Sequence, residues 1–360
     1  MIDHKLLLEK MSKYGICNDA LSWFSNYLSN RSQVVNCNGG TSERKDIHTG
    51  VPQGSALGPF LFLIFVNDFP QALSEASSNF FADDCATYTS GKSFVETSQK
   101  LQTAVSEAEG WYRNNRLPLC TDKSFHFISS SERRLKNIPI YPNIQLNNEN
   151  LKREMISPYL GMQLDGALKW NKHIKELCKK LNYKIFLLGR VKKFFNKKIL
   201  SMLYKANIQP TTDYAISIWS FCSDNNKNLI RRLQHRAARI VCNDFDYINT
   251  RGETLMKELG WQTIEQRRDY FVSTLMYKCL NDMAPTRIMN EINKASDTHD
   301  VNTRLANTDD LYIPEPNCEL FRHSFRYYGP SLWNGLPQAL RDSPSIDAFK
   351  YNYKLQYFRC

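Results

Sequence analysis

The stretch Asn79-Phe80-Phe81-Ala82-Asp83-Asp84-Cys85-Ala86-Thr87-Tyr88 organises the first half of the chain. Apolar and β-favouring residues flank two adjacent carboxylates, which predicts two short strands meeting at a tight turn with Asp83 and Asp84 at its tip. Asp is common in turns. Strands of this composition are nevertheless expected in a core, where adjacent carboxylates repel each other unless cations bind them. The stretch therefore predicts a metal site that would hold two Mg²⁺ ions for phosphoryl or nucleotidyl transfer.

Composition indicates an ordinary globular protein with an uneven charge. The chain has 360 residues, of which 42% are hydrophobic and 23% charged, and a formal net charge of +11. Residues 166–240 hold 17 Lys and Arg against 3 acidic residues, so a charge of +14 lies in this segment. Such a basic block predicts a polyanionic partner, with nucleic acid favoured over a membrane surface.

The cysteines and the chain start indicate an intracellular protein that is not secreted. The ten cysteines are scattered, with no C-x-x-C pair and no zinc spacing, which predicts free thiols and no disulfide framework. Residues 1–5 lack the apolar core of a signal peptide, and the apolar run 61–66 is too short to span a bilayer. Nothing in the sequence points to a membrane or to a protein partner.

The first half reads as a mixture of helices and short strands. Helices are expected over residues 4–15, 20–28, 59–66 and 93–114, and a hairpin over 33–47. Residues 159–165 read as a single strand that closes a first domain. Between these elements, the Gly/Pro-rich run Gly50-Val51-Pro52-Gln53-Gly54-Ser55-Ala56-Leu57-Gly58-Pro59 forms a loop that leads into an apolar helix.

The second half reads as helical. An apolar stripe runs from Ile174 through Leu181 to Leu188 at helical spacing. Basic residues occupy the other faces of this helix and of a later one, and the nucleic-acid-binding candidates among them are Lys172, Lys175, Lys179, Lys180, Lys184, Arg232, Arg236 and Arg239. A lysine-rich face is often only a solvated face, but the length of this basic block favours a polyanion-binding surface.

Three motifs in this order resemble the reverse transcriptases of non-LTR retrotransposons, particularly the jockey-type LINE elements. They are Gly50-Val51-Pro52-Gln53-Gly54-Ser55 with Gly58-Pro59, then Phe81-Ala82-Asp83-Asp84, then Tyr159-Leu160-Gly161 with Trp170 and His173. The resemblance extends to Asp3-His4-Lys5-Leu6-Leu7 at the start and to Leu332-Trp333-Asn334 near the end. It implies an α+β fold: a right-hand polymerase palm of antiparallel sheet and helices over 1–165, a basic α-helical thumb over 166–245, and a mostly helical region over 246–360.

The resemblance also implies roles for individual residues. Asp83 and Asp84 match the catalytic carboxylates that bind two Mg²⁺ ions, with Asp83 the more direct ligand. Gln53 and Gly54 match the loop beside the incoming nucleotide and the template base, and Lys123 matches a lysine near the triphosphate. Leu160 and Gly161 match a strand turn that holds the primer end. The implied partners are an RNA template, a DNA primer and dNTPs.

Comparison with this family also implies a gap. Its members carry a strand of the form Asp-x-x-x-Ala-Phe-Asp just before the position of Asp3, and its first Asp is a third metal ligand. The chain begins after that position, which predicts an N-terminally truncated polymerase without fingers and with little or no activity.

Two alternatives remain open beside the truncated reverse transcriptase. The first is a non-catalytic nucleic-acid-binding protein that uses the basic helices and has no use for the Asp pair. The second is an unrelated metal-dependent phosphoryl-transfer enzyme, which would leave Gln53, Gly54 and the basic helices without a role.

Overall fold

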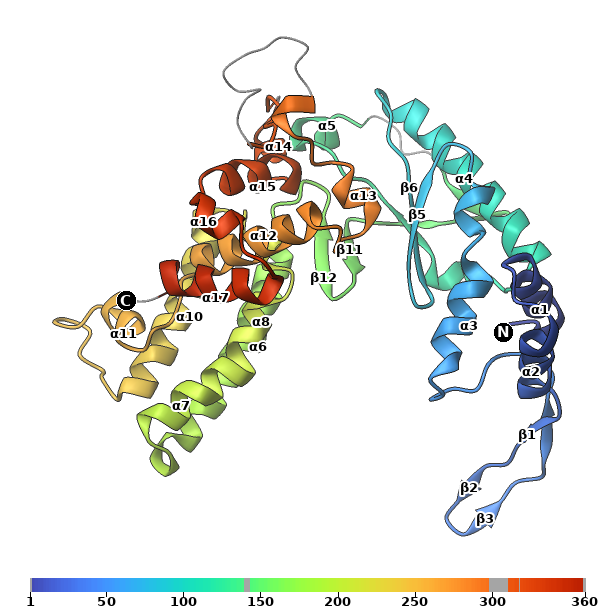
Figure 1. The fold of residues 1–360 in the computed structure, drawn as a ribbon, viewed down its shortest axis with the longest axis horizontal. Helices are drawn as coiled ribbons and strands as arrows, with labels where there is room; N and C mark the ends of the chain where they lie inside the picture. The colour runs from blue at the N-terminus through green and yellow to red at the C-terminus, as the bar shows by residue number, and fades with distance from the viewer. Residues whose placement is uncertain (1, 139–142, 298–309, 317, 359–360) are drawn as a thin grey trace. The chain divides into compact units, whose positions relative to one another are not determined.

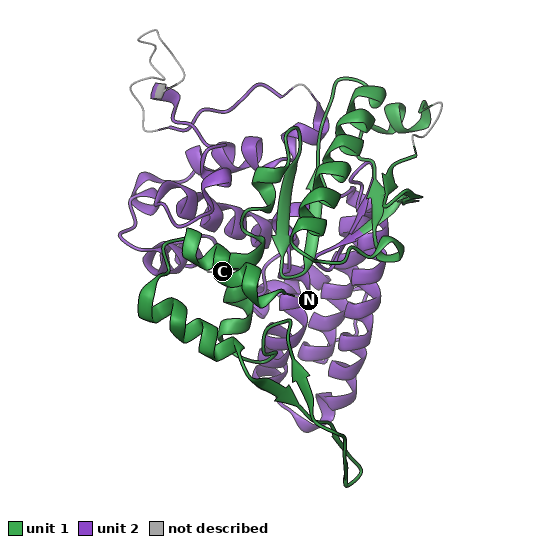
Figure 2. Ribbon diagram, turned by 90° about the vertical axis from the view of Figure 1, so that its right-hand side faces the viewer, with its two compact units in different colours: residues 1–157 green, residues 158–360 purple. Residues whose placement is uncertain are grey.

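The computed structural model describes residues 2–138, 143–297, 310–316 and 318–358. The chain forms two compact units, residues 1–157 and 158–360 (Figure 2). The boundary between them lies at residue 157, and the core of the second unit extends across residue 245. The division into palm, thumb and C-terminal region at residues 165 and 245 rests on the family resemblance and not on packing, so it stays a prediction.

The first unit combines helices with two-stranded sheets (Figure 1). Its helices are α1 (His4–Lys13), α2 (Asn18–Leu28), α3 (Leu57–Val66), η1 (Phe69–Ala72), α4 (Phe94–Asn114), η2 (Thr121–Lys123) and α5 (Glu132–Lys136). Its strands are β1 (Arg31–Gln33), β2 (Asn36–Cys37), β3 (Gly40–Thr41), β4 (Lys45–Ile47), β5 (Ser77–Phe81), β6 (Asp84–Tyr88), β7 (Phe125–Phe127), β8 (Gln145–Leu146), β9 (Glu149–Asn150) and β10 (Lys152–Glu154). The four helices and the hairpin expected from the sequence are therefore present.

Local sequence explains where the first-unit helices begin. Asp3 caps α1, because its Oδ1 accepts a hydrogen bond from the Leu6 amide at 3.0 Å. Ser93 caps α4 in the same way through the Glu96 amide at 3.1 Å. The buried residues of α1 and α3 pack together in one core, which includes Leu7, Met11, Leu61 and Phe65.

The β5–β6 hairpin differs from the expectation of a buried pair of strands. No residue of either strand is buried, and the Phe81 side chain is 63% exposed. Within the described residues β5 and β6 pair only with each other, and only Phe80 packs against the core of the unit. A two-stranded ribbon packed on one side leaves its other face and both edges to solvent.

The hairpin of β11 (Ile156–Tyr159) and β12 (Met162–Asp165) crosses the unit boundary, because β11 starts two residues before it. The expectation of one strand over 159–165 was wrong, because Leu160 and Gly161 turn the chain with φ of 46° and 76°. Two consecutive positive φ angles reverse the chain direction, and Gly161 adopts one of them without steric cost.

The other named elements in the described part of the second unit are helices (Figure 1). The helices up to residue 242 are α6 (Asn171–Val191), η3 (Lys192–Phe194), α7 (Lys197–Leu203), the π-helical turn η4 (Tyr204–Ile208), α8 (Gln209–Asp213), α9 (Ile216–Trp219) and α10 (Asp224–Cys242). They are followed by α11 (Gly252–Glu258), α12 (Ile264–Leu280), α13 (Thr286–Met289), η5 (Ala295–Asp297), α14 (Glu319–Arg322), α15 (Phe325–Asn334), α16 (Gln338–Arg341) and α17 (Ile346–Tyr357).

The apolar stripe of α6 lies in the core of the second unit. Ile174, Leu177, Leu181, Ile185 and Leu188 are all at most 5% exposed, as the spacing predicted. Burying five such side chains contributes roughly 1.5–3 kcal/mol each. The opposite faces of α6 therefore remain for the lysines. Among the described residues no helix is long and apolar enough to span a membrane.

Candidate active site

Asp83 and Asp84 lie at the end of the β5–β6 hairpin, as the sequence predicted. Phe81 pairs with Asp84 in the ladder, so Ala82 and Asp83 form a two-residue turn. Ala82 has a φ of 51°, the left-handed conformation that tight hairpin turns of this kind require at their first central residue. Both carboxylates are exposed. The turn thus places two negative charges side by side at the surface.

Aromatic packing holds the turn end of this hairpin. The Phe80 and Phe69 rings meet edge to face with centroids 5.1 Å apart, and Phe69 contacts Trp111 of α4 at the same distance. The Tyr112 ring also meets Phe69 edge to face, with centroids 5.5 Å apart. Burial raises the pKa of Tyr112, so its hydroxyl stays protonated.

The hairpin supplies two carboxylates, which fit part of a divalent-cation site. Mg²⁺ prefers oxygen ligands and is commonly held by one or two carboxylates together with water and phosphate oxygens. In the described part of the chain no group of three or more His, Cys, Asp or Glu side chains could hold a metal ion. The donor chemistry therefore suits such a cation, while a third protein ligand does not come from the described residues.

The loop of Gln53 and Gly54 is preorganised by its own hydrogen bonds. The Ser55 hydroxyl donates to the Pro52 carbonyl at 2.9 Å and accepts from the Gly58 amide at 3.0 Å. Gly54 has a φ of 80°, and a Cβ atom there would meet no neighbour within 4 Å. Backbone conformation rather than space requires glycine here, and the open surface over Gly54 leaves room for a substrate.

Lys123 lies in η2, on a separate segment from the Asp hairpin and the Gln53 loop. Its side chain is exposed, as is that of Gln53. No hydrogen bond or ion pair joins Lys123 or Gln53 to Asp83 or Asp84 within the described residues. The structure thus places the two neighbouring carboxylates at one exposed turn, and the roles of these carboxylates and of Gln53, Gly54 and Lys123 stay predictions.

The turn predicted to hold the primer end is fixed by Tyr214. The Tyr214 hydroxyl donates to the Leu160 carbonyl at 2.5 Å, and a Cβ atom on Gly161 would lie 3.6 Å from the Tyr214 ring. Sequence reasoning missed Tyr214, because 54 residues separate it from Leu160 and no local pattern links them. The tyrosine holds a turn in which Leu160 adopts an unfavourable left-handed conformation.

The basic residues of α6 and α10 have unequal access to solvent. Lys172, Lys175, Lys179, Lys180, Arg232 and Arg236 are exposed. Lys172 lies 3.5 Å from Glu176, and Arg236 donates to the Asn182 side chain. Lys184 is half-buried and donates to the Asn207 carbonyl and the Thr211 hydroxyl. The surface is therefore less basic than the sequence alone indicates.

Arg239 was predicted to bind nucleic acid, but the structure places it in the interior of the second unit. It is 5% exposed, and its guanidinium donates to the carbonyls of Asp246 and Thr250. The Tyr247 ring covers it at 4.2 Å. A side chain used in this way fixes the loop after α10 and has no group left to meet a phosphate at the surface.

Comparisons with known proteins agree with the motifs. Residues 1–164 match the family model described as "Reverse transcriptase (RNA-dependent DNA polymerase)". The chain is 27% identical over 282 residues to the probable RNA-directed DNA polymerase from transposon BS of Drosophila melanogaster, covering 73% of this chain and 30% of that protein. It is also similar to the RNA-directed DNA polymerases from mobile element jockey of D. melanogaster, at 26% identity, and of D. funebris, at 28%.

Each jockey alignment covers 62% of this chain and 25% of the relative. The chain thus spans less than a third of the length of these curated relatives. The comparisons confirm the resemblance to reverse transcriptases of non-LTR retrotransposons, and the mixture of helices and small sheets in residues 1–164 is consistent with a polymerase fold.

Proposed function

We propose that this chain, whose first 164 residues match a reverse transcriptase model, contributes the Asp83–Asp84 hairpin to RNA-directed DNA synthesis. The observation that carries the proposal is the pair of exposed carboxylates at the tip of a hairpin anchored by Phe80. The partners would be an RNA template, a DNA primer and dNTPs. Residues 1–165 would correspond to palm, and residues 166–245, with their basic helices, to thumb.

The chemistry of the carboxylate pair follows from its position. Two Mg²⁺ ions, when bound there, would supply Lewis-acid activation of the primer 3′-hydroxyl and neutralise charge on the leaving pyrophosphate. Asp83 and Asp84 would hold the metals, with Asp83 the more direct ligand. Gln53 and Gly54 would face the incoming nucleotide, and Lys123 would approach its triphosphate. Leu160 and Gly161 would hold the primer end.

We further propose that the chain by itself is weak or inactive as a polymerase. Asp83 and Asp84 would hold a divalent cation as two carboxylates at an exposed turn, without a third protein ligand from the described residues. Loss of a ligand or of its support typically costs tenfold to a hundredfold in metal affinity or activity. We therefore expect the hairpin to need a further carboxylate before nucleotidyl transfer becomes efficient.

A primer-extension assay tests both parts of the proposal. The purified chain is incubated with a primed RNA template, dNTPs and Mg²⁺, beside the Asp83→Asn variant and an Asp19→Asn control. Asp19 is an exposed carboxylate of α2. Extension by the chain that Asp83→Asn abolishes and Asp19→Asn leaves intact would support the catalytic role and refute the inactivity. Extension that survives Asp83→Asn would contradict the catalytic role.

A second candidate function is nucleic-acid binding without catalysis. The observation that favours it is the row of exposed lysines on α6 combined with the incomplete metal-ligand set. This function predicts binding to an RNA–DNA duplex that weakens steeply with salt and survives Asp83→Asn. Failure to bind either RNA or DNA would count against both functions.

A further inference from the structure

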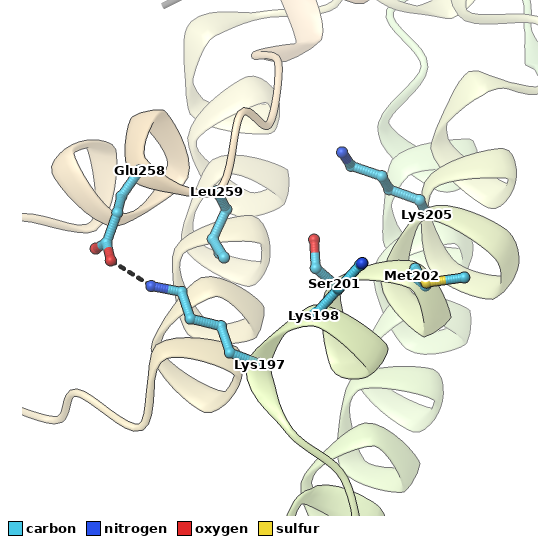
Figure 3. A pocket seen from close by; sticks show the side chains of 7 residues that line it. All are labelled: Lys197, Lys198, Ser201, Met202, Lys205, Glu258 and Leu259. Carbon is cyan, nitrogen blue, oxygen red and sulfur yellow. Dashed lines mark hydrogen bonds and ion pairs between the residues drawn. The ribbon is translucent and has the colours of Figure 1, made fainter.

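A shallow basin on the second unit gathers lysines that the predicted α6 and α10 surface does not include. Its volume is about 430 Å³, and it lies between α7 with η4 on one side and the end of α11 on the other (Figure 3). The lining residues are Lys197, Lys198, Ser201, Met202, Lys205, Glu258 and Leu259. Three lysines stand against one glutamate, so the basin carries an excess of positive charge.

The helical spacing places the polar groups of this basin on one face. Lys198, Ser201, Met202 and Lys205 follow one another at intervals of three, one and three residues, which is the pattern of a single helix face. Figure 3 shows the Lys198, Ser201 and Lys205 side chains directed to the same open space. They therefore present two ammonium groups and a hydroxyl to a common ligand.

Lys198 and Lys205 have no charged or hydrogen-bonding partner among the residues that the structure describes. Lys197 forms an ion pair with Glu258, which neutralises the acid of the basin. Neither Lys198 nor Lys205 makes a hydrogen bond or an ion pair within the described part of the chain. Two unpaired ammonium groups beside an acid that is already neutralised favour the binding of an anion.

The wall behind these groups is rigid. Tyr204 and Trp261 are buried and stack with centroids 3.5 Å apart. The Trp261 indole donates its Nε1 hydrogen to Ser201 Oγ at 3.0 Å, so the serine acts as the acceptor there and keeps its hydroxyl hydrogen to donate. The π-helical turn that contains Lys205 is rare and is often found at functional sites. The serine donor thus starts from a fixed position.

We propose that this basin binds a backbone phosphate of a nucleic acid. Lys198 and Lys205 contact the phosphate oxygens, the Ser201 hydroxyl donates to one of them, and the exposed Met202 side chain and Leu259 provide an apolar wall for the adjoining sugar. The identity of the ligand rests on the proposed function, whereas the anion site itself rests on the arrangement of these side chains. The site lies on α7 and η4, outside the α6 and α10 candidates.

Fluorescence anisotropy of the full chain with a labelled RNA–DNA duplex, repeated over a KCl series, tests the site. We expect Lys198→Gln/Lys205→Gln to weaken binding about tenfold and to reduce the slope of log affinity against log salt by about 0.9, the value for one phosphate contact. Met202→Glu, which adds a negative charge while keeping both lysines, should weaken binding at least as much. The matched control Lys13→Gln/Lys45→Gln removes two exposed lysines of the first unit and should leave the slope unchanged.

Several outcomes would overturn the inference. The first is an equal loss of duplex affinity in the control and in the basin variants. The second is that the unsubstituted chain binds no nucleic acid. The third is full displacement of the duplex by millimolar inorganic phosphate at constant ionic strength. Basin-dependent binding to phosphatidylserine vesicles without duplex binding would assign the site to a membrane instead. Basin-dependent duplex binding in a chain without primer extension would support the site and contradict only the catalytic part of the proposed function.

Discussion

The ion pair between Arg267 and Asp213 offers a direct test of what holds the second unit together. Arg267 of α12 donates from Nε to Asp213 Oδ1 at 2.9 Å, and its Nη2 donates to the other carboxylate oxygen. Each side chain is only 14% exposed. The pair joins the end of α8 to α12, so it links elements 54 residues apart in sequence.

Removal of the carboxylate leaves the guanidinium buried. Breaking a buried pair on one side typically costs about 3–5 kcal/mol. The Tyr270 and Phe271 rings lie 5.6 and 5.2 Å from the guanidinium and keep part of the stabilisation. We therefore expect Asp213→Ala to lower the free energy of unfolding by about 3 kcal/mol, near the lower end of that range.

The assay is urea unfolding followed by far-ultraviolet circular dichroism. The matched control is Glu291→Ala, which removes the partner of Arg326 from an ion pair at 3.2 Å whose two side chains are each 50% exposed. That change should cost less than about 1 kcal/mol. A double variant, Asp213→Leu/Arg267→Met, should recover most of the loss, because apolar replacements of a buried pair are often neutral. Equal destabilisation by Asp213→Ala and Glu291→Ala would refute the reasoning.

Three further predictions concern caps and turns. Asp3→Ala should cost about 1 kcal/mol through loss of the α1 cap. The hydrogen bond from the Leu6 amide, and then Arg116, lower the pKa of Asp3. The Asp3 carboxylate therefore stabilises the folded protein above about pH 4, and this contribution is lost as the pH falls below that value. Urea unfolding from pH 3 to 7 should show a weaker pH dependence in Asp3→Asn. Gly161→Ala should destabilise by about 1–2 kcal/mol because φ is positive there, and thermal unfolding that matches the parent would contradict this. Thr263→Ala removes the capping box that Thr263 forms with Gln266 and should lower the free energy of unfolding by about 1 kcal/mol. Thermal unfolding of this variant that matches the parent would contradict the role of the box.

Local patterns predicted most elements of the first unit. The helical spacing of apolar residues, the apolar run before Val66 and the Asp-Asp pair between β-favouring residues act over a few neighbouring positions, so the helices and the β5–β6 hairpin follow from the sequence. The same applies to the α6 stripe, whose five apolar positions are all buried. The motifs that contain Asp83 and Gly54 predict their roles, and these roles stay predictions.

The sequence does not reveal which side chains are exposed or which hydrogen-bond partners they have. Arg239 has the same spacing as the surface arginines of α10, yet it is buried because the loop after the helix folds over it and accepts its hydrogen bonds. Phe81 looks like a core residue and is exposed because its hairpin packs on one face only. In both cases the outcome depends on whether another segment packs over the side chain, which the pattern within the helix or strand does not reveal.

The sequence by itself determined the local elements, the basic character of residues 166–240 and the resemblance to reverse transcriptases, since all three are carried by short-range patterns and residue identity. Only the tertiary structure decided which lysine and arginine side chains lack an ion-pair or hydrogen-bond partner among the described residues. The distance between two charged groups on separate helices depends on long-range packing, and this packing pairs Lys197 with Glu258, buries Arg239, and leaves Lys198 and Lys205 facing an open basin.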